Sequence, residues 1–138
     1  MTEIVRFGVS LEKDLLQKFD RLIRHSGYVS RSKALADIVR EKLVQREWAL
    51  GKGVVGTITM IYNHHQRELT SRLTNIQHDY HQVVLASQHI HLDHDNCLEV
   101  VIVKGLPSKV QALAGGMKAC RGVKHLALTM GSTGSGLK

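Results

Sequence analysis

The chain has 138 residues, of which 43% are hydrophobic and 22% are charged, and this balance is typical of a folded protein and not of a disordered chain. Its longest apolar stretches, such as residues 54–62, are far shorter than the roughly 20 residues that cross a bilayer, which argues against a membrane protein. Two cysteines cannot form a disulfide framework, and the first residues carry no recognisable secretory signal, so we expect a cytoplasmic protein. The formal net charge of +7 is compatible with a polyanion as partner.

Charge divides the chain into two halves. The first 50 residues hold 17 of the 31 charged residues, and Gly51-Lys52-Gly53 follows them as a short flexible join. We therefore predict a small domain over residues 1–50, a second domain over 51–130, and a disordered tail rich in glycine and serine over 131–138.

The first domain is predicted to consist of one strand and two helices. Apolar residues alternate with others over residues 4–11, which is the pattern of a strand with one buried face. Apolar residues then recur at helical spacing from Leu15 to Ile23, Gly27 ends this helix, and Ser30 is placed to cap a second helix. A lone strand with two helices can neither bury a core nor pair its own backbone, so we expect two chains to pair their strands antiparallel in a dimer.

The opposite face of such a two-stranded ribbon would present Arg6, Gly8 and Ser10 of each chain. A ribbon of this kind fits the major groove of DNA, where Arg6 suits the two acceptors of guanine. An edge strand with a solvated arginine and an ordinary capped helix explains the pattern about equally well. The start of the second helix offers N–H groups, hydroxyls and positive charge to DNA phosphates through Ser30, Arg31, Ser32 and Lys33.

Residues 3 to about 48, with this strand, the Gly27-Tyr28 turn and the Ser30-Arg31-Ser32 helix start, resemble the ribbon-helix-helix family of DNA-binding repressors. The resemblance implies binding to double-stranded operator DNA through the paired strands of a dimer. Antitoxins and metabolite-responsive repressors share the same pattern, so the signal that the protein responds to has to be sought in the second domain.

The second domain is predicted to alternate short strands and helices. We expect strands over residues 54–62, 82–92, 97–104 and 123–130, helices over 64–76 and 106–121, and a turn over 93–96. The resulting βαββαβ order is that of a ferredoxin-like fold, and the ACT-type regulatory domain is one version of it. The predicted fold class is therefore α+β, with a βαα ribbon-helix-helix segment followed by an ACT-like domain.

Histidines are concentrated in the second domain, with seven of the nine in residues 64–94. His89 and His91 point to the same face of a strand, and Cys97 begins the next strand after a short turn. Two imidazoles and a thiolate are three of the four donors of a typical transition-metal site, and His78 is the best candidate for the fourth donor. Asp79 or His81 would be the next candidates, and exposed strand histidines without a metal explain the spacing equally well. We interpret the remaining histidines of this stretch as surface or auxiliary residues: His64, His65, His81 and His94.

A ribbon-helix-helix segment followed by a βαββαβ domain with Gln77-His78 and His89-x-His91-x5-Cys97 resembles the NikR family of nickel-responsive transcriptional regulators. The resemblance extends over residues 3 to about 130. It implies a homotetramer with one Ni(II) per chain in a planar site, where His89, His91 and Cys97 come from one chain and His78 from its neighbour. It also implies that the protein is not an enzyme but a repressor, which binds operator DNA when nickel is bound and controls nickel uptake.

The resemblance further implies that Tyr62 and Glu99 support the metal ligands from behind. Two residues depart from the family pattern: Gly8 replaces a frequent hydroxyl residue, and Lys33 replaces an acidic residue of some members, which puts an accessory cation site there in doubt. On the residues alone, zinc or copper in place of nickel stays open, as does a ribbon-helix-helix regulator that responds to a small metabolite. A metal-dependent hydrolase is disfavoured, because no nucleophile motif accompanies the histidines.

Overall fold

The computed structural model describes residues 2–137, which divide into two compact units. The N-terminal unit extends to Leu43 and includes the last residues from Gly136, and the C-terminal unit spans Val44–Ser135. The domain boundaries at residues 50 and 130 stay predictions, because helix α2, Arg31–Ala49, continues through the junction of the two units. In the range 2–137, no helix combines the length and the apolar character that a membrane span requires.

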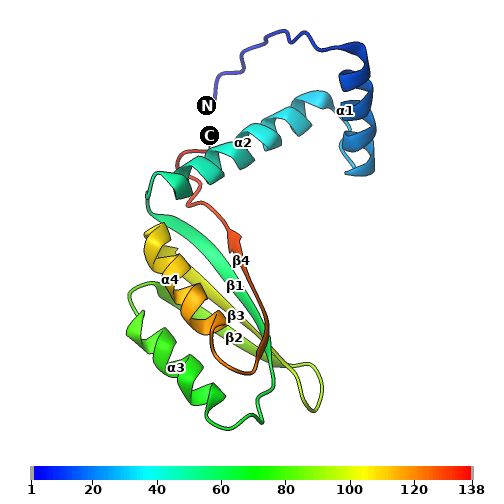
Figure 1. Ribbon diagram of the computed structural model, residues 1–138. Helices are drawn as coiled ribbons and strands as arrows, with labels where there is room; N and C mark the ends of the chain where they lie inside the picture. The colour runs from blue at the N-terminus through cyan, green and yellow to red at the C-terminus, as the bar shows by residue number, and fades with distance from the viewer. Residues whose placement is uncertain (1, 138) are drawn as a thin grey trace. The chain divides into compact units, whose positions relative to one another are not determined.

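Two helices form the N-terminal unit, namely α1, Lys13–His25, and the first part of α2 (Figure 1). Gly27 lies in the turn between them with a φ of 80°, a left-handed conformation that glycine adopts without strain. The hydroxyl oxygen of Ser30 accepts a hydrogen bond from the backbone N–H of Lys33 at 3.1 Å. Ser30 therefore caps α2, as the sequence predicts.

Residues 2–12 form no strand, although the alternating pattern predicts one over residues 4–11. A strand needs a second strand to complete its backbone hydrogen bonds, and within residues 2–137 no strand is paired with this segment. The side chains that would face a core are exposed instead, at 76% for Val5, 74% for Phe7 and 60% for Val9. Among the described residues of this unit, only Ile23 and Ala34 are buried, so the unit has almost no core of its own.

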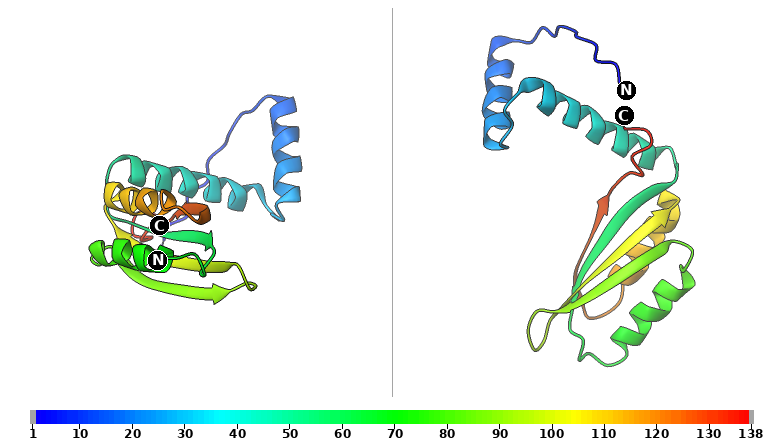
Figure 2. Two further views of the ribbon diagram at one scale, coloured as in Figure 1. Left: turned by 60° about the horizontal axis from the view of Figure 1, so that its bottom comes forward. Right: turned by 180° about the vertical axis from the view of Figure 1, so that it is seen from behind.

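The C-terminal unit is a four-stranded antiparallel sheet with two helices. Helices α3, Leu69–Asp79, and α4, Pro107–Lys118, cover one face of the sheet (Figure 2). The element order is the predicted βαββαβ, which confirms the ferredoxin-like arrangement and the α+β class. The strands lie in the order β2-β3-β1-β4, with bounds Val54–Tyr62 for β1, Val84–His91 for β2, Cys97–Gly105 for β3 and Val123–Met130 for β4.

Helix α3 begins later than the sequence predicts, at Leu69 in place of residue 64. Asn63 explains the difference, because its side-chain oxygen accepts a hydrogen bond from the backbone N–H of His65 at 2.9 Å, and its backbone oxygen accepts one from Gln66 at 3.1 Å. An asparagine that bonds to the backbone in this way favours a turn over a helix. His64 consequently lies outside the helix, directly after the end of β1.

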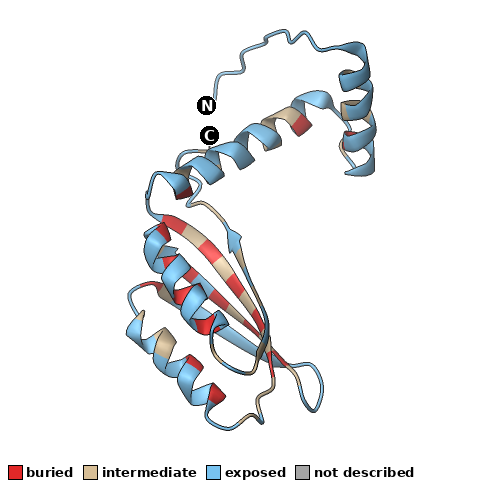
Figure 3. Cartoon of the chain, in the orientation of Figure 1, coloured by how far each residue is buried: buried red, intermediate tan, exposed pale blue. Residues whose placement is uncertain are grey.

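The core of the C-terminal unit lies between the sheet and its helices (Figure 3). Buried and half-buried residues alternate along β1, so one face of this strand points to the helices. Ile90 and Ile102, on the opposite face of the sheet, are 43% and 40% exposed, and within the C-terminal unit, Val44–Ser135, no helix covers this face (Figure 2). The largest fully buried side chains include Ile58, Met60, Tyr62, Leu69, Leu73, Leu113 and Met117.

Trp48, in the last turn of α2, is part of this core and only 5% exposed. Its Nε1–H donates a hydrogen bond to the backbone oxygen of Gly131 at 2.8 Å, and the N–H of Gly131 donates to the oxygen of Val55 at 2.8 Å. A Cβ at Gly56 would lie 3.4 Å from the indole and 2.9 Å from the backbone oxygen of Thr129. Glycine at this position therefore lets the ring lie against β1.

Replacing Trp48 with phenylalanine is expected to lower the free energy of unfolding by about 2 kcal/mol, because the hydrogen bond to Gly131 is lost and part of the indole volume is left empty. Urea unfolding at a fixed protein concentration measures this difference. Leu50→Ala is the control, since Leu50 is 56% exposed and its replacement is expected to change stability by less than about 0.5 kcal/mol. Equal stabilities of the Trp48 variant and the parent protein would contradict the packing role.

Candidate metal centre

A tight hairpin brings the predicted ligands of β2 and β3 opposite each other. The carboxylate of Asp93 accepts hydrogen bonds from the backbone N–H of Asp95 at 2.8 Å and from the side-chain amide of Asn96 at 3.0 Å, which shapes the predicted turn. The strands then pair so that His91 lies opposite Cys97. The two donor atoms, His91 Nδ1 and Cys97 Sγ, are 3.8 Å apart.

His64 joins this pair, whereas from the sequence we predicted a surface or auxiliary residue at this position. Tyr62 at the end of β1 lies opposite Cys97 of β3, so the chain leaves β1 beside the cysteine. His64 Nδ1 lies 2.9 Å from Cys97 Sγ. Sequence spacing does not reveal which strands are neighbours in a sheet, and the late start of α3 removes His64 from the predicted helix. The only signal in the sequence is the position of His64 two residues after a strand.

These three side chains fit a transition metal. The donor atoms of His64, His91 and Cys97 lie within 4.8 Å of one another, a separation compatible with donors that stand about 2.0–2.3 Å from one ion. Imidazole and thiolate donors suit nickel, copper and zinc, whereas calcium and magnesium prefer oxygen. Burial raises the pKa of the Cys97 thiol, and the neighbouring carboxylate of Glu99 adds to this rise. Metal binding therefore has to displace a proton from sulfur.

Burial also lowers the pKa of His64, and the nearby imidazoles of His65 and His91 lower it further. A lowered pKa keeps the His64 ring neutral at neutral pH, so that one of its nitrogens has a free lone pair. Its ring centroid lies 3.9 Å from that of His65 and 4.7 Å from that of His91. The His64 ring is thus a chemically competent donor next to the sulfur.

His89 lies on the same face as His91 but contacts different groups. Its Nδ1 is 3.2 Å from the hydroxyl of Tyr62 and 3.6 Å from a carboxylate oxygen of Glu99. Tyr62 donates its hydroxyl hydrogen to the Oε1 of Glu99 at 2.9 Å, and Gln77 donates its amide hydrogen to the Oε2 at 2.5 Å. Burial raises the pKa of Tyr62, and the hydrogen bond to Glu99 raises it further, so the hydroxyl keeps its proton. Tyr62 and Glu99 thus lie directly behind His89.

His78 does not join these donors within the described part of a single chain. It is exposed in the last turn of α3, and its ring centroid lies 6.1 Å from that of His81. The residue before it, Gln77, reaches the carboxylate of Glu99. The end of α3 is therefore connected to the residues behind His89, while the imidazole of His78 stays accessible.

The residues predicted to contact DNA lie in the N-terminal unit. Arg6, Gly8 and Ser10 belong to the exposed segment 2–12. At the start of α2, Ser32 is exposed and Ser30 caps the helix. Two cations of this helix start form ion pairs that we did not predict from the sequence: Arg31 with Asp20 at 2.8 Å, and Lys33 with Asp37 at 2.6 Å. The second pair has the i, i+4 spacing that could have predicted it.

Two family models match the chain. Residues 5–46 match ribbon-helix-helix proteins of the copG family, and residues 55–131 match the NikR C-terminal nickel-binding domain. The chain belongs to the NikR family of nickel-responsive regulators. It is therefore a regulator with a ribbon-helix-helix DNA-binding domain and a nickel-binding domain, and not an enzyme, as the sequence predicts.

Relatives of similar length support membership in the NikR family. A protein of Syntrophus aciditrophicus is 49% identical over 134 residues, which cover 97% of this chain and 98% of the relative. A protein of Chlorobium phaeobacteroides is 51% identical over 132 residues, which cover 96% of this chain and 98% of the relative. Both are provisionally named nickel-responsive regulators. The solved structure of an uncharacterized protein from Thermotoga maritima covers 57% of this chain and 98% of its own with a TM-score of 0.53, and at 11% identity the likeness concerns the fold alone.

Proposed function

We propose that this regulator binds one nickel ion per chain between subunits, through His89, His91 and Cys97 of one chain and His78 of a neighbouring chain. The observation that carries this proposal is the environment of His89, whose Nδ1 faces Tyr62 and Glu99. A histidine that binds a metal commonly makes a hydrogen bond through its other ring nitrogen to a carboxylate or a similar group, which fixes the ring. The Nε2 of His89 is the nitrogen that this arrangement leaves for the metal.

The accessible position of His78 supports its donation to a neighbouring subunit. Gln77 fixes the end of α3 through its hydrogen bond to Glu99, which also stands behind His89. Nickel would supply bonds that join the two subunits. Glu99 contacts both Gln77 and His89. Because Gln77 precedes His78, this carboxylate would couple the position of His89 to that of His78, which would bind the metal of the neighbouring subunit.

We propose that the protein is a homotetramer, in which paired N-terminal segments form DNA-binding dimers. The apolar side chains of Val5, Phe7 and Val9 are exposed in the chain, and pairing with a second copy would cover them. The face of the sheet opposite α3 and α4 also carries exposed apolar side chains, including Ile90 and Ile102. Two unpartnered apolar surfaces on different units support two kinds of contact between copies, as a dimer of dimers requires.

We propose that the protein is a cytoplasmic repressor, which reduces nickel uptake by binding operator DNA when nickel is bound. Arg6, Gly8 and Ser10 of two paired strands would contact the bases of an operator half-site, and the start of α2 would contact the phosphates. Joining two subunits through His78 of one chain and His89, His91 and Cys97 of the other would favour those tetramer arrangements in which both ribbons meet their half-sites together. By linkage, nickel raises the operator affinity by the same factor by which operator DNA raises the nickel affinity.

Nickel titration of the purified protein, with operator binding measured at each step, tests this proposal. We expect operator affinity to rise by at least about tenfold, which lies within the usual range of allosteric coupling, and to saturate at one ion per chain. Zinc and copper are titrated in parallel, because the donors alone suit all three metals. Equal operator affinity with and without nickel, or a response to zinc or copper alone, would contradict the proposal.

A further inference from the structure

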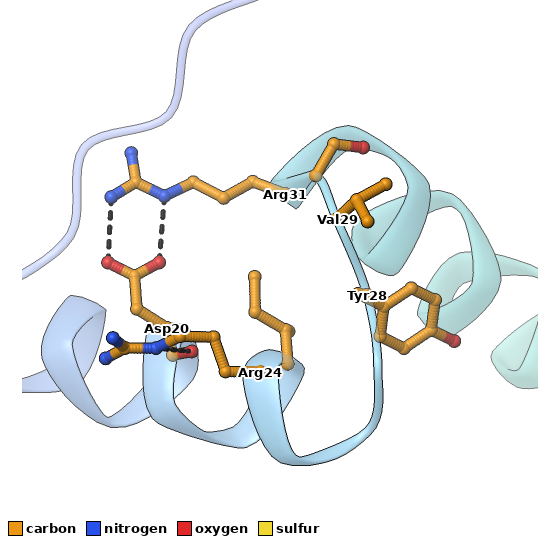
Figure 4. A pocket seen from close by; sticks show the side chains of 7 residues that line it. Asp20, Arg24, Tyr28, Val29 and Arg31 are labelled. Carbon is orange, nitrogen blue, oxygen red and sulfur yellow. Dashed lines mark hydrogen bonds and ion pairs between the residues drawn. The ribbon is translucent and has the colours of Figure 1, made fainter.

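Asp20 and Arg31 form a two-point ion pair between α1 and the first residue of α2 (Figure 4). Arg31 Nε donates a hydrogen bond to Asp20 Oδ1 at 2.9 Å, and Arg31 Nη2 donates to Asp20 Oδ2 at 2.8 Å. The side chain of Arg31 is 61% exposed, whereas that of Asp20 is 29% exposed. The carboxylate is thus the more fixed partner, and the guanidinium extends from it toward solvent.

This pairing uses only one edge of the guanidinium. An arginine side chain has five N–H donors in a rigid plane, and the pair with Asp20 occupies one on Nε and one on Nη2. The edge formed by Nη1 and the outer hydrogen of Nη2 stays available. Two parallel donors of this kind match two oxygens of a phosphate.

Arg31 is the first residue of α2 and follows its cap, Ser30. Its backbone therefore lies where the helix dipole favours an anion, and its guanidinium extends from there to Asp20 of α1 (Figure 4). Lys33 is held differently: its Nζ contacts Asp37, which also accepts a hydrogen bond from the hydroxyl of Tyr28 at 2.9 Å. A lysine ammonium has no planar pair of donors, so its ion pair with Asp37 cannot orient a second pair of N–H groups toward a phosphate.

We propose that Asp20 is a positioning residue for operator binding, which holds the guanidinium of Arg31 so that its free edge meets a phosphate of the DNA backbone. Holding the side chain in place before binding avoids the loss of rotamer entropy that a free arginine suffers when it contacts DNA. The negative charge of Asp20 opposes the phosphate, but both of its oxygens face Arg31. This inference rests on the DNA-binding role of Arg31 in the proposed function.

The test compares Asp20→Asn with Asp14→Asn in the full-length, nickel-loaded protein on operator DNA. Both variants remove one negative charge from α1, but Asp14 takes no part in the pair with Arg31. We expect Asp20→Asn to weaken operator binding about fivefold, the effect of a well-formed exposed ion pair, and Asp14→Asn to leave it equal or slightly tighter. Thermal unfolding of both variants checks that the helices are equally stable. Binding by Asp20→Asn as tight as that of the parent protein would overturn the proposal.

Arg31→Lys separates positioning from a general effect of charge. The lysine keeps the positive charge but lacks the planar fork, so we expect it to bind the operator about as weakly as Asp20→Asn does. Adding Asp20→Asn to Arg31→Lys is then expected to cause no further loss of operator affinity. If Asp20→Asn weakened operator binding in the Arg31→Lys background as much as it does in the parent protein, Asp20 would not act through Arg31.

The same series distinguishes failure of this inference from failure of the proposed function. The nickel response is read from the parent protein, by comparing its operator affinity with and without the metal. If that response is missing, the proposed function fails, but a contact to the DNA backbone needs only DNA. The comparison of Asp20→Asn with Asp14→Asn on the same fragment without nickel then still decides the positioning role.

Discussion

Replacing Cys97 with serine is expected to weaken nickel binding more than about 100-fold, since loss of a group that merely supports a ligand already costs about 10- to 100-fold. The nickel-dependent gain in operator affinity is expected to disappear with it. Cys97 is the sulfur that lies beside His64 and His91, and its side chain is fully buried at the end of the β1–β3 pair. A serine hydroxyl occupies similar space but does not ionise near neutral pH, so it cannot replace the thiolate.

Absorption spectroscopy during a nickel titration measures this effect directly, because a thiolate bound to nickel gives a charge-transfer band. Cys120→Ser is the matched control, since Cys120 is half-buried and its Sγ contacts the backbone oxygen of Gly116 at 3.5 Å, away from the histidines. We expect Cys120→Ser to keep both the band and the operator response. Circular dichroism and the mass in solution check that each variant folds and assembles. An unchanged nickel affinity in Cys97→Ser would exclude Cys97 as a ligand.

The elements of the C-terminal unit could be predicted because its sequence patterns are local. Residues 54–62 alternate on a strand that has one face on the core, and β1 has those bounds. The turn around Asp93 places Cys97 opposite His91, as expected from the short separation of the two strands. A strand in the N-terminal segment could be expected from the same alternation, but no strand of the described residues pairs with it, so residues 2–12 form no strand here.

The contacts that the sequence did not predict join residues far apart in the chain. His64 lies beside Cys97 because β1 is the neighbour of β3, and β1 is also paired with β4 on its other side. Gln77 of α3 donates a hydrogen bond to Glu99 of the central strand β3. Hydrophobic periodicity shows which face of an element is buried, but it does not show which two elements are adjacent. The family resemblance implied supporting roles for Tyr62 and Glu99, and both lie beside His89.

His89→Ala and His64→Ala are expected to have unequal effects, and the inequality decides which imidazole accompanies His91 and Cys97 at the metal. We expect His89→Ala to weaken nickel binding more than about 100-fold and to abolish the operator response, and His64→Ala to weaken nickel binding by about tenfold at most. The reason is the position of the supporting groups. Tyr62 and Glu99 lie next to Nδ1 of His89, whereas the Nδ1 of His64 faces the sulfur itself.

In the proposed site, His64 contacts Cys97 without being a metal ligand. In the tautomer that carries its hydrogen on Nδ1, the imidazole of His64 would donate to the sulfur and stabilise the thiolate against the burial that raises the pKa of Cys97. His64 would then prepare the sulfur for the metal without binding it, so its loss slows or weakens binding without removing a donor. Nickel affinities of both variants, with the operator response beside them, measure the difference. A larger loss in His64→Ala than in His89→Ala would place the metal among His64, His91 and Cys97 of one chain, and would contradict the proposed site between subunits.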